Sequence, residues 1–302
     1  MNRRSFLTYA AGAAVSNCSG APSPTIIDTH THFYDPARPQ GVPWPSKSDD
    51  VLYRTVLPDE YRRMTKPLGV TGTIVVEASP LLEDNQWILD LAANNPVIAG
   101  FVGHLDPGDA AFRKNLDRFR KNRLFLGIRL SSSSLKDPNA EFISNLKAMA
   151  DAGLELDAIG GTPVLEQTAR LTDRIPNLRI VIDHLPFEPP SDAASLSELG
   201  KRPQVYAKVS NVARRVGNRV PEDVDYYRAS LDELWNVFGA DRLVYGSNWP
   251  VSDHVAPYAA LLKIVREYFA EKGVGASEKF FWRNAEAAYR YPPKPRDIAL
   301  SR

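Results

Sequence analysis

Short apolar runs alternate along the chain with longer segments in which apolar residues recur at helical spacing. The runs are apolar nearly throughout, a pattern typical of strands buried on both faces of a parallel sheet. Eight such runs lie at Thr25–His30, Gly72–Ala78, Val97–Gly103, Leu124–Leu130, Leu154–Ile159, Leu178–His184, Gln204–Val209 and Arg242–Gly246. The helical segments between them include Leu81–Asn94, Ala110–Lys121, Glu141–Ala152 and Pro221–Phe238.

Eight strands that alternate with helices predict an α/β fold, specifically a closed (β/α)8 TIM barrel in a single domain. An open doubly wound sheet is the alternative, but no glycine-rich phosphate motif follows the first run, which disfavours it. The longest gap between runs, Phe33 to Thr71, is rich in proline and holds a short helical stretch near Asp59–Met64. We expect this insertion to be a loop that faces the substrate.

The first residues differ in kind from the rest of the chain. Arg3 and Arg4 precede a short apolar stretch, Phe6–Val15, and then small residues and proline. This pattern predicts a twin-arginine export signal over residues 1–23 and a periplasmic or exported protein, with an untargeted N-terminus as the alternative. Cys18, the single cysteine, follows Asn17 and so suits lipid attachment poorly. Residues 24–302 form the predicted barrel, and no other segment approaches the length of a membrane span.

The charge balance narrows the class of partner. Lysine and arginine number 37 and aspartate and glutamate 36, so there is no electrostatic case for binding nucleic acid. A small-molecule substrate is the expected partner. The sequence gives no indication of the oligomeric state.

The five histidines gather near strand ends. His30 and His32 close the first predicted strand, His104 follows the third, His184 closes the sixth and His254 follows the eighth. In a barrel the carboxyl ends of the strands converge on one face, where active sites are built. The sequence therefore predicts a histidine-lined site at that face.

His30-Thr31-His32 is the sharpest motif in the chain. Side chains two residues apart on a strand point to the same side, so both imidazoles can face one metal ion, and imidazole suits zinc. His184, at the same end of the barrel, is the expected third ligand, while Asp183 beside it can point outward and hold a supporting hydrogen bond. The alternative for the tripeptide is a pair of partly buried histidines without a metal.

Several motifs lie at or near predicted strand ends: Asp28–Pro36, Pro43–Trp44, Gly127–Arg129, Asp183–Leu185, Lys208–Ser210, Tyr245–Val251, Asn284–Ala285 and Tyr289. Together they resemble the amidohydrolase-2 group of the amidohydrolase superfamily, and within it the sugar-lactonase branch. The resemblance implies a (β/α)8 barrel that hydrolyses a lactone or related cyclic ester. It also implies that His30, His32 and His184 bind a divalent metal such as Zn²⁺, although a metal-free mechanism also occurs in this branch.

Asn248 departs from the pattern of this family, which usually has an aspartate there as general base. An amide has no usable pKa near neutrality, so Asn248 can orient a water but cannot accept its proton. Another carboxylate, Asp253, Glu77 or Asp157, can supply the base. Alternatively, the substrate is an activated ester that needs little proton assistance, or the site binds a ligand without turning it over.

Five further residues are candidates for substrate contact. Arg129 and Lys208, near strand ends, are expected to anchor a carboxylate or ring oxygens, with an ion pair at the barrel rim as the alternative for each. Trp44 and Trp249 can form an apolar wall against a sugar ring, or pack the rim. His104 can donate a hydrogen bond to a carbonyl or leaving group, or be structural.

These observations predict a metal-assisted hydrolase of a sugar-derived or carboxylate-bearing lactone. A non-oxidative decarboxylase of the same superfamily is the enzymatic alternative. The Gly246–Pro250 motif and the Pro43-Trp44 loop favour the lactonase branch over it. A catalytically silent binding barrel remains the third hypothesis because of Asn248.

Overall fold

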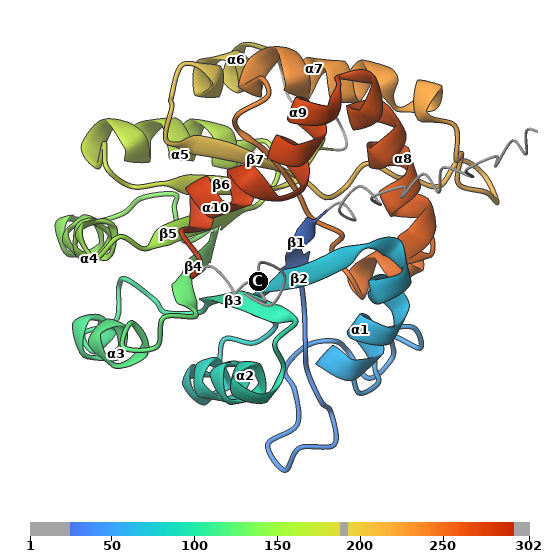
Figure 1. The fold of residues 1–302 in the computed structure, drawn as a ribbon. Coiled ribbons are helices and arrows are strands. Elements are labelled where there is room, and N and C mark those ends of the chain that lie inside the picture. Colours follow the sequence, from blue (N-terminus) through green and yellow to red (C-terminus); the bar gives the residue numbers. More distant parts are fainter. Residues whose placement is uncertain (1–24, 188–192, 293–302) are drawn as a thin grey trace, which may run out of the picture.

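The computed structural model describes residues 25–187 and 193–292 of the chain, so the predicted export signal lies outside the described residues (Figure 1). Eight parallel strands pair in the order of the sequence, each with the next. The strands are β1 (Ile26–Thr31), β2 (Val70–Val76), β3 (Ile98–Gly103), β4 (Phe125–Ser131), β5 (Glu155–Ile159), β6 (Ile180–Leu185), β7 (Val205–Val209) and β8 (Leu243–Tyr245).

Helices surround the strands (Figure 1). They are α1 (Pro58–Thr65), α2 (Leu82–Asn94), α3 (Phe112–Phe119), α4 (Ala140–Asp151), α5 (Pro163–Arg174), α6 (Ala193–Gly200), α7 (Arg228–Phe238), α8 (Tyr258–Glu271), α9 (Val274–Glu278) and α10 (Asn284–Tyr289), with short turns η1 (Lys66–Leu68), η2 (Val224–Tyr226), η3 (Val251–His254) and η4 (Lys279–Arg283). The single helix predicted over Pro221–Phe238 is wrong: η2 and α7 share that stretch. The Asp223 carboxylate caps η2 by accepting from the Asp225 N–H, so a separate turn begins there.

The last strand returns to the first at the mouth of the barrel. Thr31 and Trp249 form a parallel bridge, and the N–H of His32 donates to the Trp249 carbonyl oxygen at 2.9 Å. Lower down, the Thr29 hydroxyl donates to the carbonyl oxygen of Tyr245 at 2.7 Å. Eight strands, closure and the outer helices together confirm the predicted (β/α)8 barrel.

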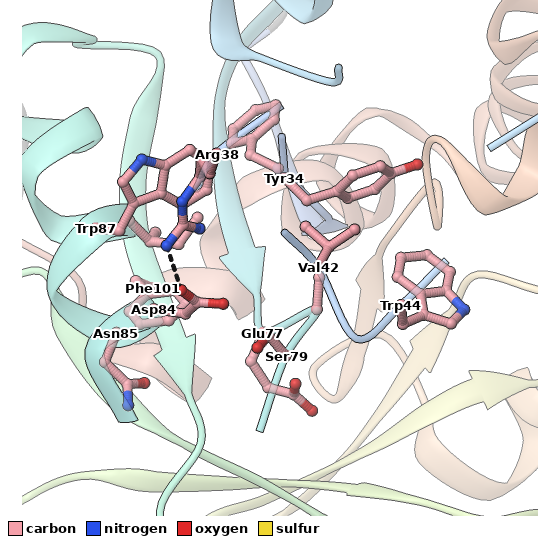
Figure 2. A pocket seen from close by; sticks show the side chains of 13 residues that line it. Tyr34, Arg38, Val42, Trp44, Glu77, Ser79, Asp84, Asn85, Trp87 and Phe101 are labelled. Carbon is pink, nitrogen blue, oxygen red and sulfur yellow. Dashed lines mark hydrogen bonds and ion pairs between the residues drawn. The ribbon is translucent and has the colours of Figure 1, made fainter. Parts of the chain in front are cut away.

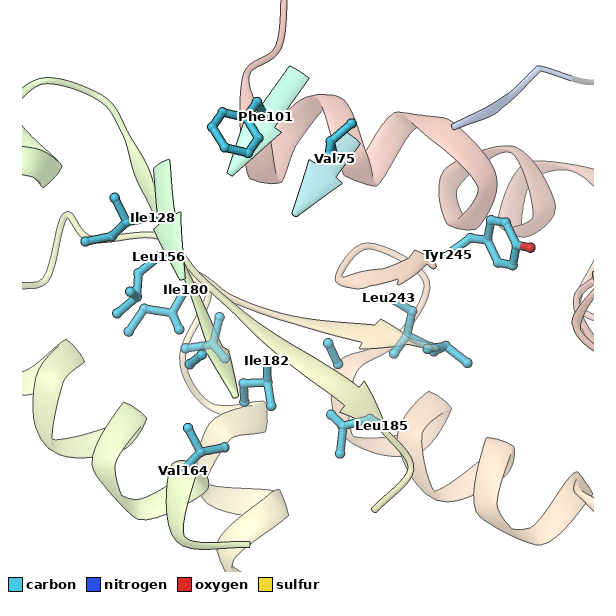
Figure 3. Packing of buried hydrophobic residues seen from close by; sticks show 14 of the residues in the cluster. Val75, Phe101, Ile128, Leu156, Val164, Ile180, Ile182, Leu185, Leu243 and Tyr245 are labelled. Atoms are coloured by element: carbon cyan, nitrogen blue, oxygen red, sulfur yellow. The ribbon is translucent and has the colours of Figure 1, made fainter. Parts of the chain in front are cut away.

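Two apolar clusters hold the barrel together. One lies between the strands and the helices, where Leu156 and Ile180 pack with Val164 of α5 (Figure 3). The other fills the barrel interior and includes Val181 together with Tyr289 of α10. The Arg179 guanidinium, directly before β6, donates to the Ala288 carbonyl oxygen at 2.6 Å, which places α10 at the end where the strands begin. The opposite end, where the strands finish, is left open for a site.

Two strands carry an extra residue where they reach that open end. In β1, Asp28 pairs with Thr73 and Thr31 with Val75, so β1 advances three residues while β2 advances two. The same shift occurs in β6 around Asp183. Such a bulge re-aims the side chains beyond it, and bulges are common beside active sites. In β1 both Ile27 and His30 consequently face the interior, which strict alternation would forbid.

Among the residues that the structure describes, no helix combines the length and apolar character that a membrane crossing requires.

Candidate active site

His30, His32 and His184 meet at the open end of the barrel. The ring centroids of His30 and His32 are 5.0 Å apart, and those of His30 and His184 are 4.4 Å apart. Ligand atoms of His30, Asp183 and His184 lie within 4.8 Å of one another, a spacing that one metal ion could bridge. The three histidines predicted from the sequence as metal ligands are thus brought together in space.

Two of these rings are oriented by their Nδ1 atoms. Nδ1 of His32 lies 3.0 Å from the carbonyl oxygen of Val76, which can only accept, so the proton is on Nδ1 and Nε2 carries the lone pair. Nδ1 of His184 lies 3.0 Å from the Ser210 hydroxyl. His184 has a φ of 64°, a left-handed conformation that is uncommon outside glycine and marks the bulge in β6.

The donor set fits a divalent cation. Nε2 of His32 offers a lone pair, and Nε2 of His30 is buried without a hydrogen-bond partner. Burial lowers the pKa of His32 to about 3 and that of His184 to about 4, and it holds the pKa of His30 well below 6.5. All three rings are therefore neutral at pH 7, as metal ligation requires. Nitrogen donors with a nearby carboxylate suit zinc.

A buried ion cluster lies directly beneath His30. The Lys208 ammonium is 2.6 Å from Asp157 Oδ2, 2.8 Å from Asp183 Oδ1 and 3.2 Å from Nδ1 of His30, and all four side chains are buried. A Cβ at Gly246 would lie 2.9 Å from the Cβ of His30, so only glycine lets the end of β8 pass this cluster.

The position of this cluster corrects two predictions. Lys208 is predicted to anchor substrate from the rim, but its side chain points into the barrel and does not line the cavity at the mouth. The outward orientation considered for Asp183 is not found either, since its side chain faces the interior and contacts Lys208. Lys208 belongs to the inward face of β7, and the extra residue in β6 lets Asp183 and His184 both serve the inner side.

A cavity of 330 Å³ opens at the mouth of the barrel. It is lined by the predicted site residues His32, Trp44, Arg129, His184 and Asn248, together with Glu77, Ala78, Ile159 and Val251. Arg129 donates from Nε to Glu77 Oε1 at 2.9 Å and from Nη2 to the Glu77 carbonyl oxygen at 2.8 Å. The wall of the cavity therefore carries an ion pair between Arg129 and Glu77, whose charges neutralise each other.

Two predicted residues lie elsewhere. Trp249 is only 1% exposed and packs against Tyr61 and Phe33, with ring centroids 5.5 and 6.4 Å away, so its predicted role as a substrate wall is wrong. The left-handed turn at Asn248 sends the following side chain into the core. His104 does not line the cavity, and Asn85 holds its backbone through two hydrogen bonds of 2.9 Å.

Asn248 lines the cavity. Of the three carboxylates that could replace the missing aspartate, only Glu77 lines the same cavity. Asp157 is buried against Lys208, and Asp253 lies 3.5 Å from Arg54 outside the cavity lining. The geometry thus selects Glu77 among the three.

A small side pocket adjoins the cavity and shares Trp44 and Glu77 with it (Figure 2). Its volume of 20 Å³ has room for about one water molecule. The Arg38 guanidinium lies over the Trp87 ring at 4.3 Å and pairs with Asp84, which closes this side. Sequence reasoning missed the pocket because most of its lining residues come from the proline-rich loop and α2, which no spacing rule connects.

Solved structures share this barrel. An amidohydrolase from Burkholderia multivorans with bound zinc superposes with a TM-score of 0.76 at 24% identity, covering 89% of this chain and 100% of that one. A probable 2-pyrone-4,6-dicarboxylic acid hydrolase from Acinetobacter baumannii gives 0.69 at 17% identity, covering 88% and 99%. The fold and its histidine-lined mouth define a barrel enzyme.

The sequence comparisons specify the family. The amidohydrolase family profile matches residues 27–291. An L-fucono-1,5-lactonase from Burkholderia ambifaria is 33% identical over 254 residues, which cover 78% of this chain and 85% of that protein. The chain belongs to the amidohydrolase family, as its motifs indicate.

Proposed function

We propose that this protein hydrolyses the ester bond of a neutral sugar lactone. The observation that carries the proposal is the ion pair of Arg129 and Glu77 on the cavity wall. Among the described residues that line the cavity, Arg129 is the one permanent cation, and Glu77 neutralises it. A carboxylate-bearing lactone would need an uncompensated cation there, whereas the hydroxyl groups of a sugar match paired donors and acceptors. The similarity to L-fucono-1,5-lactonases supports the same substrate class.

Hydrolysis requires a water oxygen to attack the lactone carbonyl carbon, after which the ring C–O bond breaks and the ring oxygen takes up a proton. Glu77 is the base that accepts the proton of the water. Both contacts of the guanidinium with the Glu77 carboxylate use Oε1, which leaves Oε2 for the proton. Asn248 orients the water through its amide, and Arg129 holds the substrate carbonyl oxygen.

A divalent metal, with zinc suited best, would be held by His30, His32 and His184. When bound it would lower the pKa of a water molecule and polarise the carbonyl group. The indole of Trp44 lies with its ring centroid 5.6 Å from that of His32 and offers an apolar face to the sugar ring.

The experiment measures proton release by the purified protein, with and without added zinc, on L-fucono-1,5-lactone, other aldonolactones and 2-pyrone-4,6-dicarboxylate. We expect the neutral lactones to be opened and the dicarboxylate to be a poor substrate. Preference for the dicarboxylate would contradict the neutral class. Release of carbon dioxide from an aromatic acid would favour the decarboxylase, and binding without turnover would favour the silent barrel.

Export is a separate part of the proposal, supported by the Arg3-Arg4 motif and the apolar stretch after it. Cell fractionation tests it: the natural chain is expected in the periplasm, and a variant with lysine at both arginine positions in the cytoplasm. An equal distribution of the two proteins would contradict export by this route.

A further inference from the structure

The Lys208 ammonium is surrounded by three atoms that can accept a hydrogen bond. Asp157 Oδ2 lies at 2.6 Å, Asp183 Oδ1 at 2.8 Å and Nδ1 of His30 at 3.2 Å. A lysine ammonium has three N–H groups and nothing that can accept a hydrogen bond. The contacts with Asp157 and His30 have the geometry of hydrogen bonds, whereas the contact with Asp183 is an ion pair.

The contact with His30 fixes the ring chemistry. Because the ammonium can only donate, Nδ1 of His30 must accept and therefore carries the lone pair, which leaves the proton on Nε2. We infer that Lys208 holds His30 in the Nε2–H tautomer and thereby sets the metal affinity of the histidine site. In His32, the carbonyl oxygen of Val76 enforces the opposite tautomer.

The competing arrangement would place the proton on Nδ1 of His30 and direct it to Asp183. That nitrogen lies 3.5 Å from Asp183 Oδ1, beyond the usual 2.7–3.2 Å range of an N–H···O hydrogen bond. It would also leave one N–H of Lys208 facing another donor. The two carboxylates of Asp157 and Asp183, at 2.6 and 2.8 Å, are the partners that a charged lysine requires inside a protein.

The consequence concerns metal binding. A neutral imidazole ligates through a lone pair, but Nε2 of His30 holds the proton in this tautomer. For His30 to become a ligand, the proton must move to Nδ1, and the carboxylate of Asp183 must replace Lys208 as its partner. Every metal ion that binds through His30 therefore breaks the contact with Lys208, so Lys208 weakens metal binding. This inference rests on the proposed function, because it concerns the same site. The tautomer of His30 can be measured without lactone turnover, so each of the two proposals can fail while the other holds.

The first test reads the tautomers directly. Chelator-treated protein labelled with ¹⁵N at histidine is observed by long-range ¹H–¹⁵N correlation, and His30→Gln and His32→Gln assign the signals. We expect the Nε2–H pattern for His30 and the Nδ1–H pattern for His32. An Nδ1–H pattern for His30 would overturn the inference.

The second test removes the ammonium without stranding a charge. Lys208→Met alone would leave two buried carboxylates unpaired and can prevent folding. The double variant Asp157→Asn/Lys208→Met keeps the net charge of the cluster and leaves Asp183 to accept from His30. We expect its His30 to switch to Nδ1–H and its zinc affinity, measured by competition with a chelator, to rise by about 10- to 100-fold, the usual size of effects from groups that orient metal ligands.

Asp157→Asn alone is the matched control, because it keeps the contact between Lys208 and His30. Its tautomer is expected to be that of the natural protein, with zinc affinity within a few-fold of it. If the double variant keeps the Nε2–H tautomer, or binds zinc no more tightly than this control, Lys208 does not set the tautomer of His30 or the zinc affinity of the site.

Discussion

The backbone N–H of Asn248 donates to the carbonyl oxygen of His30 at 2.9 Å, and this bond joins the end of β8 to the end of β1. Asn248 has a φ of 59°, a conformation that asparagine and aspartate tolerate better than other side chains. The bond places the amide of Asn248 beside the histidines whichever of these two residues is present. The departure from the family pattern is thus a change of side-chain chemistry at a backbone conformation that either residue can adopt.

Two carboxylates can be compared as the general base: Glu77, and an aspartate introduced at position 248. Glu77→Gln is expected to lower kcat on a neutral lactone by about 10²- to 10⁴-fold, the usual contribution of a general base. Asn248→Asp in the Glu77→Gln background should recover part of that loss, since it restores a carboxylate beside His32. Steady-state kinetics of the single and double variants check this, and full activity of Glu77→Gln would exclude Glu77 as the base.

The same ion pair predicts a change of ligand preference. In Glu77→Gln the Arg129 guanidinium loses its carboxylate partner, so the cavity gains one uncompensated positive charge. Inhibition of lactone hydrolysis by citrate should strengthen by about tenfold, which corresponds to one charge-assisted hydrogen bond. Arg129→Gln/Glu77→Gln, which removes both charges, is the control and should show no such gain. Equal inhibition of all forms would mean that the pair does not set the charge preference.

The two tryptophans near the mouth should behave differently. Trp44 lines the cavity, so Trp44→Ala is expected to raise KM about tenfold with little loss of stability. Trp249 is buried in the core, so Trp249→Ala should lower the free energy of unfolding by about 3–5 kcal/mol. Denaturant unfolding and kinetics on both variants test the contrast. A stability loss confined to Trp44→Ala would contradict the assignment of the two rings.

The buried histidines predict acid sensitivity of the metal-free protein. Their pKa values lie below 6.5 in the fold, about 3 for His32 and about 4 for His184, because burial disfavours the charged ring. Between pH 6.5 and 4 these rings consequently bind more protons in the unfolded chain than in the fold, and their contribution to stability falls as pH falls. Asp157, whose pKa burial raises to about 6, acts in the opposite direction, as do Glu155, Asp28 and Asp253, whose pKa values burial also raises. The contribution of the rings is therefore measured by comparing the natural protein with a histidine variant.

Thermal unfolding of chelator-treated protein across this range gives the measurement. His184→Gln removes one of the titrating rings and should flatten the decline. An identical pH dependence of the natural protein and His184→Gln from pH 6.5 to 4 would show that the His184 ring is not held neutral.

Sequence patterning was sufficient for the barrel and for the meeting of His30, His32 and His184, because strand ends in a parallel barrel converge. Patterning failed where a local irregularity of the backbone determines which way a side chain points. The extra residue in β6 lets His184 face inward next to the inward Asp183, and the left-handed Asn248 sends Trp249 into the core; neither follows from alternation. The pairing of Arg129 with Glu77 joins residues 52 positions apart, which no spacing rule connects.

Helix α10, which covers the base of the barrel, contacts the ion cluster beneath the histidines. The Tyr289 hydroxyl of α10 donates to Asp157 Oδ1 at 2.9 Å, and the other oxygen of that carboxylate holds Lys208 beneath His30. A chain shortened before α10 would admit water to the base of the barrel and weaken this ion cluster through dielectric screening. Tyr289 is therefore linked to His30 through Asp157 and Lys208. A fusion or truncation that displaces α10 would consequently change the electrostatic environment of the histidines at the mouth of the barrel.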